Sequence, residues 1–159
     1  MHLEGSCHCG AVRFAVEAPE PYPFNLCYCS ICRKTAGSGG YAIQLGARKA
    51  TLKVEGEAHV RSFHAILHDE GDAQSSGERT FCDRCGSALW LWDPRWPELV
   101  HPHAGAIDTP LPVPPERTHL MLGSKANWVE PCVGPTDKTF DRYPEESLAA
   151  WHQRLGVGG

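Results

Sequence analysis

Seven of the eight cysteines fall into three short groups whose spacing suits metal binding. The groups are Cys7-x-Cys9, Cys27-x-Cys29-x-x-Cys32 and Cys82-x-x-Cys85. Residues two apart on a strand point the same way, so a Cys-x-Cys pair can present both sulfurs to one ion. A Cys-x-x-Cys pair brackets a tight turn whose backbone amides can donate to the sulfurs. Because a chain in a reducing compartment gains nothing from disulfides, these cysteines predict bound zinc.

The groups predict two different kinds of zinc site. We call the outer pairs the four-cysteine cluster and the middle residues the three-cysteine cluster; their members are Cys7, Cys9, Cys82 and Cys85, and Cys27, Cys29 and Cys32. Four thiolates complete a tetrahedral site that is closed to substrate and therefore structural. Three thiolates leave the fourth position for water or an incoming thiol. We therefore expect two zinc ions per chain, one structural and one catalytic or exchangeable.

Other interpretations of the cysteines remain open from the sequence alone. The outer pairs can be buried thiols without a metal, and the middle three can hold a second structural zinc with a His, Cys or water as the fourth ligand. Cys132 is isolated from the three groups and is expected to be a half-buried thiol. It is the one cysteine that could complete a second closed site.

Three polar residues next to the three-cysteine cluster are candidate substrate contacts by their position. They are Ser30, Arg33 and Lys34. Three thiolates around a dication leave one negative charge on the site, where four leave two. The two neighbouring cations can offset that charge, so the three-cysteine cluster suits an anionic ligand better.

The histidines are weaker candidates for chemistry. His8 lies between two same-facing cysteines and is expected to point away from their metal. His101 and His103 face one way if the chain is extended, but Pro102 and the lack of a nearby carboxylate argue against a metal role. His119 sits in a short apolar segment and is expected to be a core residue.

The composition bounds the classes of protein that fit. The chain has 159 residues, of which 42% are hydrophobic and 21% charged, which predicts a single folded domain over residues 1–159. A net charge of −4 with scattered Lys and Arg argues against a nucleic-acid partner. The longest apolar run, 88–92, is far too short for a membrane span, and the start of the chain does not have the pattern of a signal peptide. We therefore expect no membrane partner and a cytoplasmic location.

The elements that must position the cysteines are mostly strands. Alternating apolar residues and turn residues predict strands over 10–17, 25–29, 41–45, 50–55, 59–67, 78–81, 87–92, 99–107 and 118–122. One helical turn is expected over 30–36, and a terminal helix from Pro144 to a stop at Gly156. The polar stretch 69–78 is expected to be an exposed, mobile loop. The fold class expected from these elements is mainly β.

Three segments carry a resemblance to a known family. They read Gly5-Ser-Cys-His-Cys-Gly-Ala-Val-Arg-Phe, Cys27-Tyr-Cys-Ser-Ile-Cys-Arg-Lys-Thr-Ala-Gly-Ser and Phe81-Cys-Asp-Arg-Cys-Gly-Ser-Ala-Leu. They resemble the glutathione-dependent formaldehyde-activating enzyme family, which also contains centromere protein V, and the likeness continues to Trp128. The resemblance implies a zinc-stabilised β-tent fold of antiparallel sheets, with a short C-terminal helix expected here.

The resemblance also implies site residues and an activity. It places the structural zinc on the four-cysteine cluster and the catalytic zinc on the three-cysteine cluster. The implied activity is that of a carbon-sulfur lyase, which forms and cleaves S-hydroxymethylglutathione, the adduct of glutathione and formaldehyde. Glutathione or a similar small thiol is then the expected partner. The alternative is a non-catalytic zinc-binding module for a small thiol or a protein partner.

Overall fold

The computed structural model describes residues 1–157, and most of its regular structure is β. The strands are β1 (His2–Ser6), β2 (Arg13–Glu17), β3 (Asn25–Cys27), β4 (Ala42–Ile43), β5 (Ala47–Arg48), β6 (Lys53–Glu55), β7 (Val60–Leu67), β8 (Ala73–Cys82), β9 (Ala88–Trp92), β10 (Leu99–Pro102), β11 (Thr118–Leu120) and β12 (Lys138–Thr139). The α-helices are α1 (Ser30–Ala36) and α2 (Leu148–Leu155). Short 3-10 turns are η1 (Lys49–Thr51), η2 (Glu57–His59), η3 (His68–Glu70), η4 (Ala104–Ala106) and η5 (Leu122–Ser124). The predicted fold class is confirmed.

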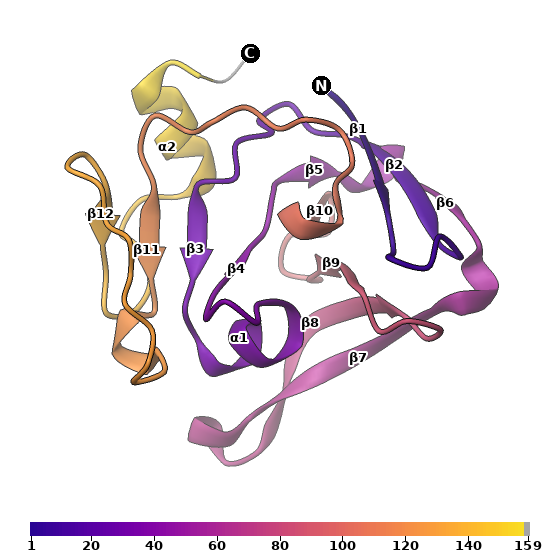
Figure 1. Ribbon diagram of the computed structural model, residues 1–159, viewed down its shortest axis with the longest axis horizontal. Coiled ribbons are helices and arrows are strands. Elements are labelled where there is room, and N and C mark those ends of the chain that lie inside the picture. Colours follow the sequence, from indigo (N-terminus) through magenta and orange to yellow (C-terminus); the bar gives the residue numbers. More distant parts are fainter. Residues whose placement is uncertain (158–159) are drawn as a thin grey trace.

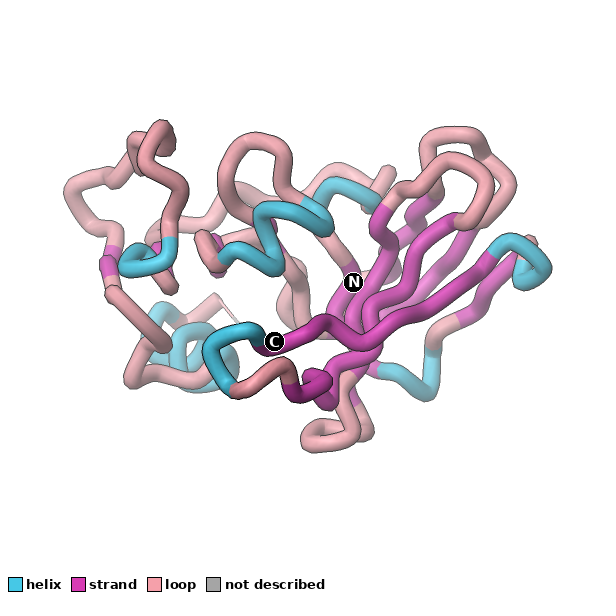
Figure 2. The backbone as a smooth tube through the Cα atoms, turned by 90° about the horizontal axis from the view of Figure 1, so that it is seen from below, coloured by secondary structure: helices cyan, strands magenta, loops and turns pink. Residues whose placement is uncertain are grey.

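The strands form three sheets with the orders β1-β2-β6, β5-β10-β9-β8-β7 and β12-β11-β3-β4. The first two sheets are antiparallel, as expected. The third is mixed, because β11 runs parallel to both β3 and β12. In Figure 1 this mixed sheet and α2 lie on the left, and the β1-β2-β6 sheet lies on the right. Figure 2 shows most of the strand length gathered in one half of the molecule, with loops and short helices in the other.

The principal core joins β1 and β2 to β9 and β10. On β2 the side chains alternate, so Phe14 and Val16 are buried while Arg13 faces solvent. Phe14 meets Trp90 of β9 edge to face, with ring centroids 5.2 Å apart. Burial of these aromatic and branched side chains is the main stabilising contribution expected for such a sheet packing.

The terminal helix starts later than its sequence pattern predicts. The side chain of Ser147 accepts a hydrogen bond from the backbone N–H of Ala150 at 3.1 Å, so Ser147 is the N-cap and α2 begins at Leu148. The helix ends at Leu155, and Gly156 is the stop as predicted; it adopts the left-handed conformation (φ 63°). Trp151 stacks on Phe24 with centroids 3.7 Å apart, and this contact holds α2 against the segment that enters β3.

The prediction of a loop over 69–78 is wrong for 73–78. β8 begins at Ala73 and pairs with β7 as a long hairpin, so the exposed connection is shortened to 68–72, which contain η3 and the turn at Gly71 and Asp72. Most residues at this end of the hairpin are exposed, and 73–78 show no apolar alternation in the sequence. This part of β8 is therefore formed by backbone pairing with β7 and not by burial of one face. β1 was also not predicted. The strand predicted over 99–107 ends at Pro102, and a 3-10 turn follows.

Within residues 1–157, no helix is both long enough and apolar enough to cross a bilayer.

Candidate functional site

The four-cysteine cluster joins the turn after β1 to the turn after β8. Its four sulfurs lie within 4.8 Å of one another. The Cys7 and Cys9 sulfurs are 3.6 Å apart, and those of Cys9 and Cys82 are 3.9 Å apart. A tetrahedral ion with zinc–sulfur bonds of about 2.3 Å requires sulfur–sulfur edges of about 3.8 Å. The donor set therefore fits a closed four-coordinate site, formed between residues far apart in the sequence.

The turns of this cluster supply donors to the sulfurs. The backbone N–H of Val12 donates to Cys7 Sγ at 3.2 Å. Ser87 Oγ lies 3.2 Å from Cys85 Sγ, and this hydrogen bond lowers the pKa of the Cys85 thiol to about 5. Gly86 takes a left-handed conformation (φ 77°) that closes the Cys-x-x-Cys turn. Such donors stabilise thiolates, the form in which cysteine binds metal.

The three-cysteine cluster forms where β3 runs into α1. Cys27 ends β3, Cys29 is the N-cap of α1, and Cys32 is a buried residue of α1. The Cys29 sulfur accepts a hydrogen bond from the backbone N–H of Cys32 at 3.3 Å. The three sulfurs lie within 4.8 Å of one another. Strand, cap and first helical turn thus bring together the residues that the spacing grouped.

Within residues 1–157, no further His, Cys, Asp or Glu joins this set of three at the same distance. Cys132 is exposed and lies outside it, although it was expected to be half-buried. The described part of the chain therefore offers three sulfurs to an ion here, compared with four at the other cluster. The two clusters can each hold a metal ion, and sulfur ligands are compatible with zinc.

Close packing of the three thiols shifts their acidity in opposite directions. Hydrogen bonds from the Cys27 and Cys32 side chains lower the pKa of Cys29 to about 2. The same contact with Cys29 raises the pKa of Cys27. One sulfur therefore ionises readily while its neighbours resist, and a bound cation is what would allow all three to become thiolates.

Two polar side chains that the sequence did not single out reach Cys32. Gln44 Nε2 donates to its sulfur at 3.8 Å, and Arg79 Nη2 donates at 3.9 Å. Arg79 also donates through Nη1 to Thr35 Oγ1 at 3.4 Å, which joins β8 to α1. Neither residue is near Cys32 in the sequence, so only the pairing of the sheets could reveal them.

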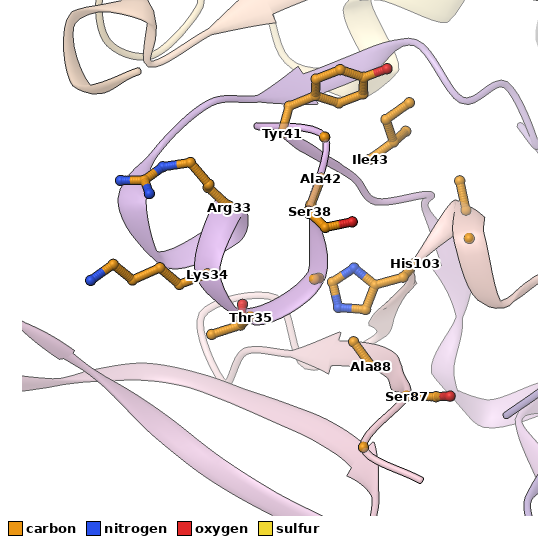
Figure 3. A pocket seen from close by; sticks show the side chains of 16 residues that line it. Arg33, Lys34, Thr35, Ser38, Tyr41, Ala42, Ile43, Ser87, Ala88 and His103 are labelled. Carbon is orange, nitrogen blue, oxygen red and sulfur yellow. The ribbon is translucent and has the colours of Figure 1, made fainter. Parts of the chain in front are cut away.

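A pocket of about 730 Å³ lies beside α1, between the segment leading into β4 and the residues around β9 and η4 (Figure 3). Its lining includes Arg33, Lys34, Thr35, Ser38, Tyr41, Ser87 and His103, and no acidic residue. Of the predicted substrate contacts, Arg33 and Lys34 therefore line a pocket. In Figure 3 their charged ends point away from His103. Ser30 is exposed and does not line the pocket.

Behind the three-cysteine cluster lies a buried hydrogen-bonded chain of three side chains. Tyr28, which separates two of the cysteines, has its hydroxyl 2.8 Å from His119 Nδ1. His119 Nε2 lies 3.1 Å from Asp137 Oδ2. Because the carboxylate can only accept, Nε2 carries a proton, and in the neutral imidazole Nδ1 then accepts from the Tyr28 hydroxyl. His119 is buried as predicted, but its partners became visible only through the parallel pairing of β11 with β3, which brings Tyr28, and with β12, which brings Asp137.

Comparison with known proteins places these features in a family. Residues 2–123 match the family described as glutathione-dependent formaldehyde-activating enzyme. A protein of Halomonas elongata named "Putative glutathione-dependent formaldehyde-activating enzyme" is 60% identical over 157 residues, which is 99% of this chain and 98% of that protein. A crystal structure of a Rhodobacter sphaeroides protein superposes with a TM-score of 0.53 at 26% identity, covering 69% of this chain and 91% of that one.

Proposed function

Because the chain belongs to the glutathione-dependent formaldehyde-activating enzyme family, we propose that it forms and cleaves the carbon–sulfur bond between formaldehyde and glutathione or a similar small thiol. The product is then S-hydroxymethylglutathione or its analogue, and the reaction class is that of a carbon-sulfur lyase. The observation that carries this proposal is a three-sulfur set at the start of α1, the helix whose Arg33, Lys34 and Thr35 line a pocket, whereas the other set is complete with four sulfurs. A metal site with three protein ligands keeps a position for substrate.

We assign the metal sites as follows. The four-cysteine cluster holds a structural zinc that ties the turn after β1 to the turn after β8. The three-cysteine cluster holds the zinc used in the reaction, and that ion, when bound, supplies a positive charge that favours the thiolate form of a substrate thiol. Gln44 and Arg79 orient Cys32 through the contacts at its sulfur. Arg33 and Lys34 provide positive charge at the rim for the carboxylates of glutathione.

The proposal is tested by zinc content and rate together. The wild-type protein is expected to hold about two zinc ions per chain and to accelerate adduct formation above the uncatalysed rate. Cys29→Ser should lose about one zinc and the acceleration while remaining folded. Cys9→Ser is the matched control, because it removes a ligand from the four-cysteine cluster and should lower stability. If Cys29→Ser keeps the rate and both zinc ions, the assignment of the three-cysteine cluster is wrong.

The same experiment decides between catalysis and simple binding. A non-catalytic zinc module would bind glutathione with a zinc-dependent affinity and show no acceleration. Thiol ligands for zinc need a reducing environment to escape oxidation, and on that ground the cytoplasm remains our proposed location. The single-domain organisation over residues 1–159 likewise remains a proposal.

A further inference from the structure

One side chain in the pocket is buried without any hydrogen-bond partner from the protein. His103 is 6% exposed, and within the part of the chain that the structure describes its Nδ1 atom has no partner. In Figure 3 the ring lies among Thr35, Ser38 and Ala88 and faces α1. Buried polar groups are almost always paired, so an unpaired one in the wall of a pocket indicates a place for a ligand group.

His103 also belongs to the surroundings of Cys32. It is bridged to Gln44 in an antiparallel pairing, and side chains opposite each other in such a pairing lie on the same face. The Gln44 side chain on that face reaches the Cys32 sulfur at 3.8 Å. Arg79 connects that sulfur to Thr35, which lines the pocket together with His103. His103 is therefore linked to the Cys32 sulfur through Gln44, its partner in the bridge, and through Thr35, its neighbour in the pocket wall.

The imidazole is neutral under ordinary conditions. Burial lowers the pKa of His103 to about 4, and the charge of Arg79 acts in the same direction. A neutral imidazole has one N–H donor and one acceptor nitrogen. A neutral donor can stabilise negative charge that develops on a substrate oxygen without giving up its proton.

We infer that His103 donates a hydrogen bond to the oxygen atom of the one-carbon unit that the substrate thiol carries. This inference rests on the proposed function. As the adduct forms, the thiolate sulfur bonds to the aldehyde carbon and the electron pair of the carbon–oxygen π bond moves to the oxygen. The thiol releases one proton to the solvent when it ionises, and the oxygen then takes one proton from the solvent, so the number of protons is unchanged. In the reverse direction the carbon–sulfur bond breaks, and His103 stabilises the same charged oxygen.

The test compares substitutions at two histidines, His101 in β10 and His103 just after it. His103→Phe removes the donor, His103→Gln keeps an N–H, and His101→Gln is the matched control because His101 is two residues away and pairs with the backbone carbonyl of Leu45. Exchange between ¹³C-formaldehyde and its glutathione adduct is followed by magnetisation-transfer NMR, with the rate without protein subtracted. His103→Phe should lower kcat about 100-fold, as loss of one oxyanion donor does. His103→Gln should recover much of that loss, and His101→Gln should stay within about twofold of wild type.

Two readouts do not depend on rate. Glutathione alone lacks the oxygen in question, so its affinity and the zinc content should be the same in His103→Phe and in wild type. In ¹⁵N-labelled wild-type protein, the His103 imidazole signals should shift with glutathione and formaldehyde together and not with glutathione alone. The inference is overturned if kcat is unchanged in His103→Phe. It is also overturned if glutathione alone shifts the imidazole signals as much as glutathione and formaldehyde together. If His103→Phe does not fold, His103→Gln and the imidazole shifts decide. If wild type shows no acceleration, the proposed function fails, and the imidazole signals still decide whether His103 meets the adduct.

Discussion

Replacing Tyr28 by Phe tests whether the buried chain of Tyr28, His119 and Asp137 stabilises the platform that carries the three-cysteine cluster. The substitution removes one hydroxyl and no carbon, so it leaves almost no cavity. It deprives His119 Nδ1 of its donor at 2.8 Å, and His119 is only 1% exposed, so water cannot take the donor's place. A buried acceptor left unpaired costs about 1–3 kcal/mol. We expect a loss of about 2 kcal/mol in the free energy of unfolding, because the imidazole also pairs with a carboxylate.

The assay is urea unfolding of zinc-loaded protein, followed by tryptophan fluorescence, together with the melting temperature. For a chain of this size, 2 kcal/mol corresponds to a decrease in Tm of about 6 °C. Tyr41→Phe is the control, since Tyr41 packs on Tyr28 with ring centroids 5.2 Å apart but is 37% exposed, so its hydroxyl can be hydrated. That variant should change stability by less than about 0.5 kcal/mol. Equal stability of the two variants would refute the argument that the buried chain of hydrogen bonds supports this part of the fold.

Further predictions concern the two clusters and pH. Cys82→Ala should prevent stable folding, because a structural zinc contributes on the order of 10 kcal/mol in small zinc domains. Cys32→Ala should abolish the rate with a much smaller decrease in Tm. Equal decreases in Tm in the two variants would contradict the division between structural and catalytic sites. Protonation of His103 should lower stability in acid: its folded pKa of about 4 lies below the ordinary 6.5, so the unfolded chain binds more protons between these values. Its contribution is complete above about pH 6.5 and is lost as the pH falls toward 4, in total about 3 kcal/mol. Measured by urea unfolding from pH 7 to 5, wild type should therefore lose stability more steeply than His103→Gln, and parallel curves would exclude this effect.

Local sequence patterns determined the features that depend on neighbouring residues. The helical turn over 30–36, the alternation on β2 and the end of α2 at Gly156 all follow from residue types within a few positions. The grouping of the cysteines belongs here as well, because two or three residues of spacing suffice to aim sulfurs at one point. The same segments carried the family resemblance, which the match over residues 2–123 confirmed.

Tertiary structure alone decided which distant residues meet. The parallel pairing of β3 with β11 unites Tyr28 with His119, 91 positions away, and the five-stranded sheet brings Arg79 to Cys32 across 47 positions. The extension of β8 to Ala73 escaped prediction because exposed strand ends need no apolar alternation. Side-chain patterns report which face of an element is buried but not which partner covers it. Strand order and register, which determine those partners, arise from the packing of the whole chain.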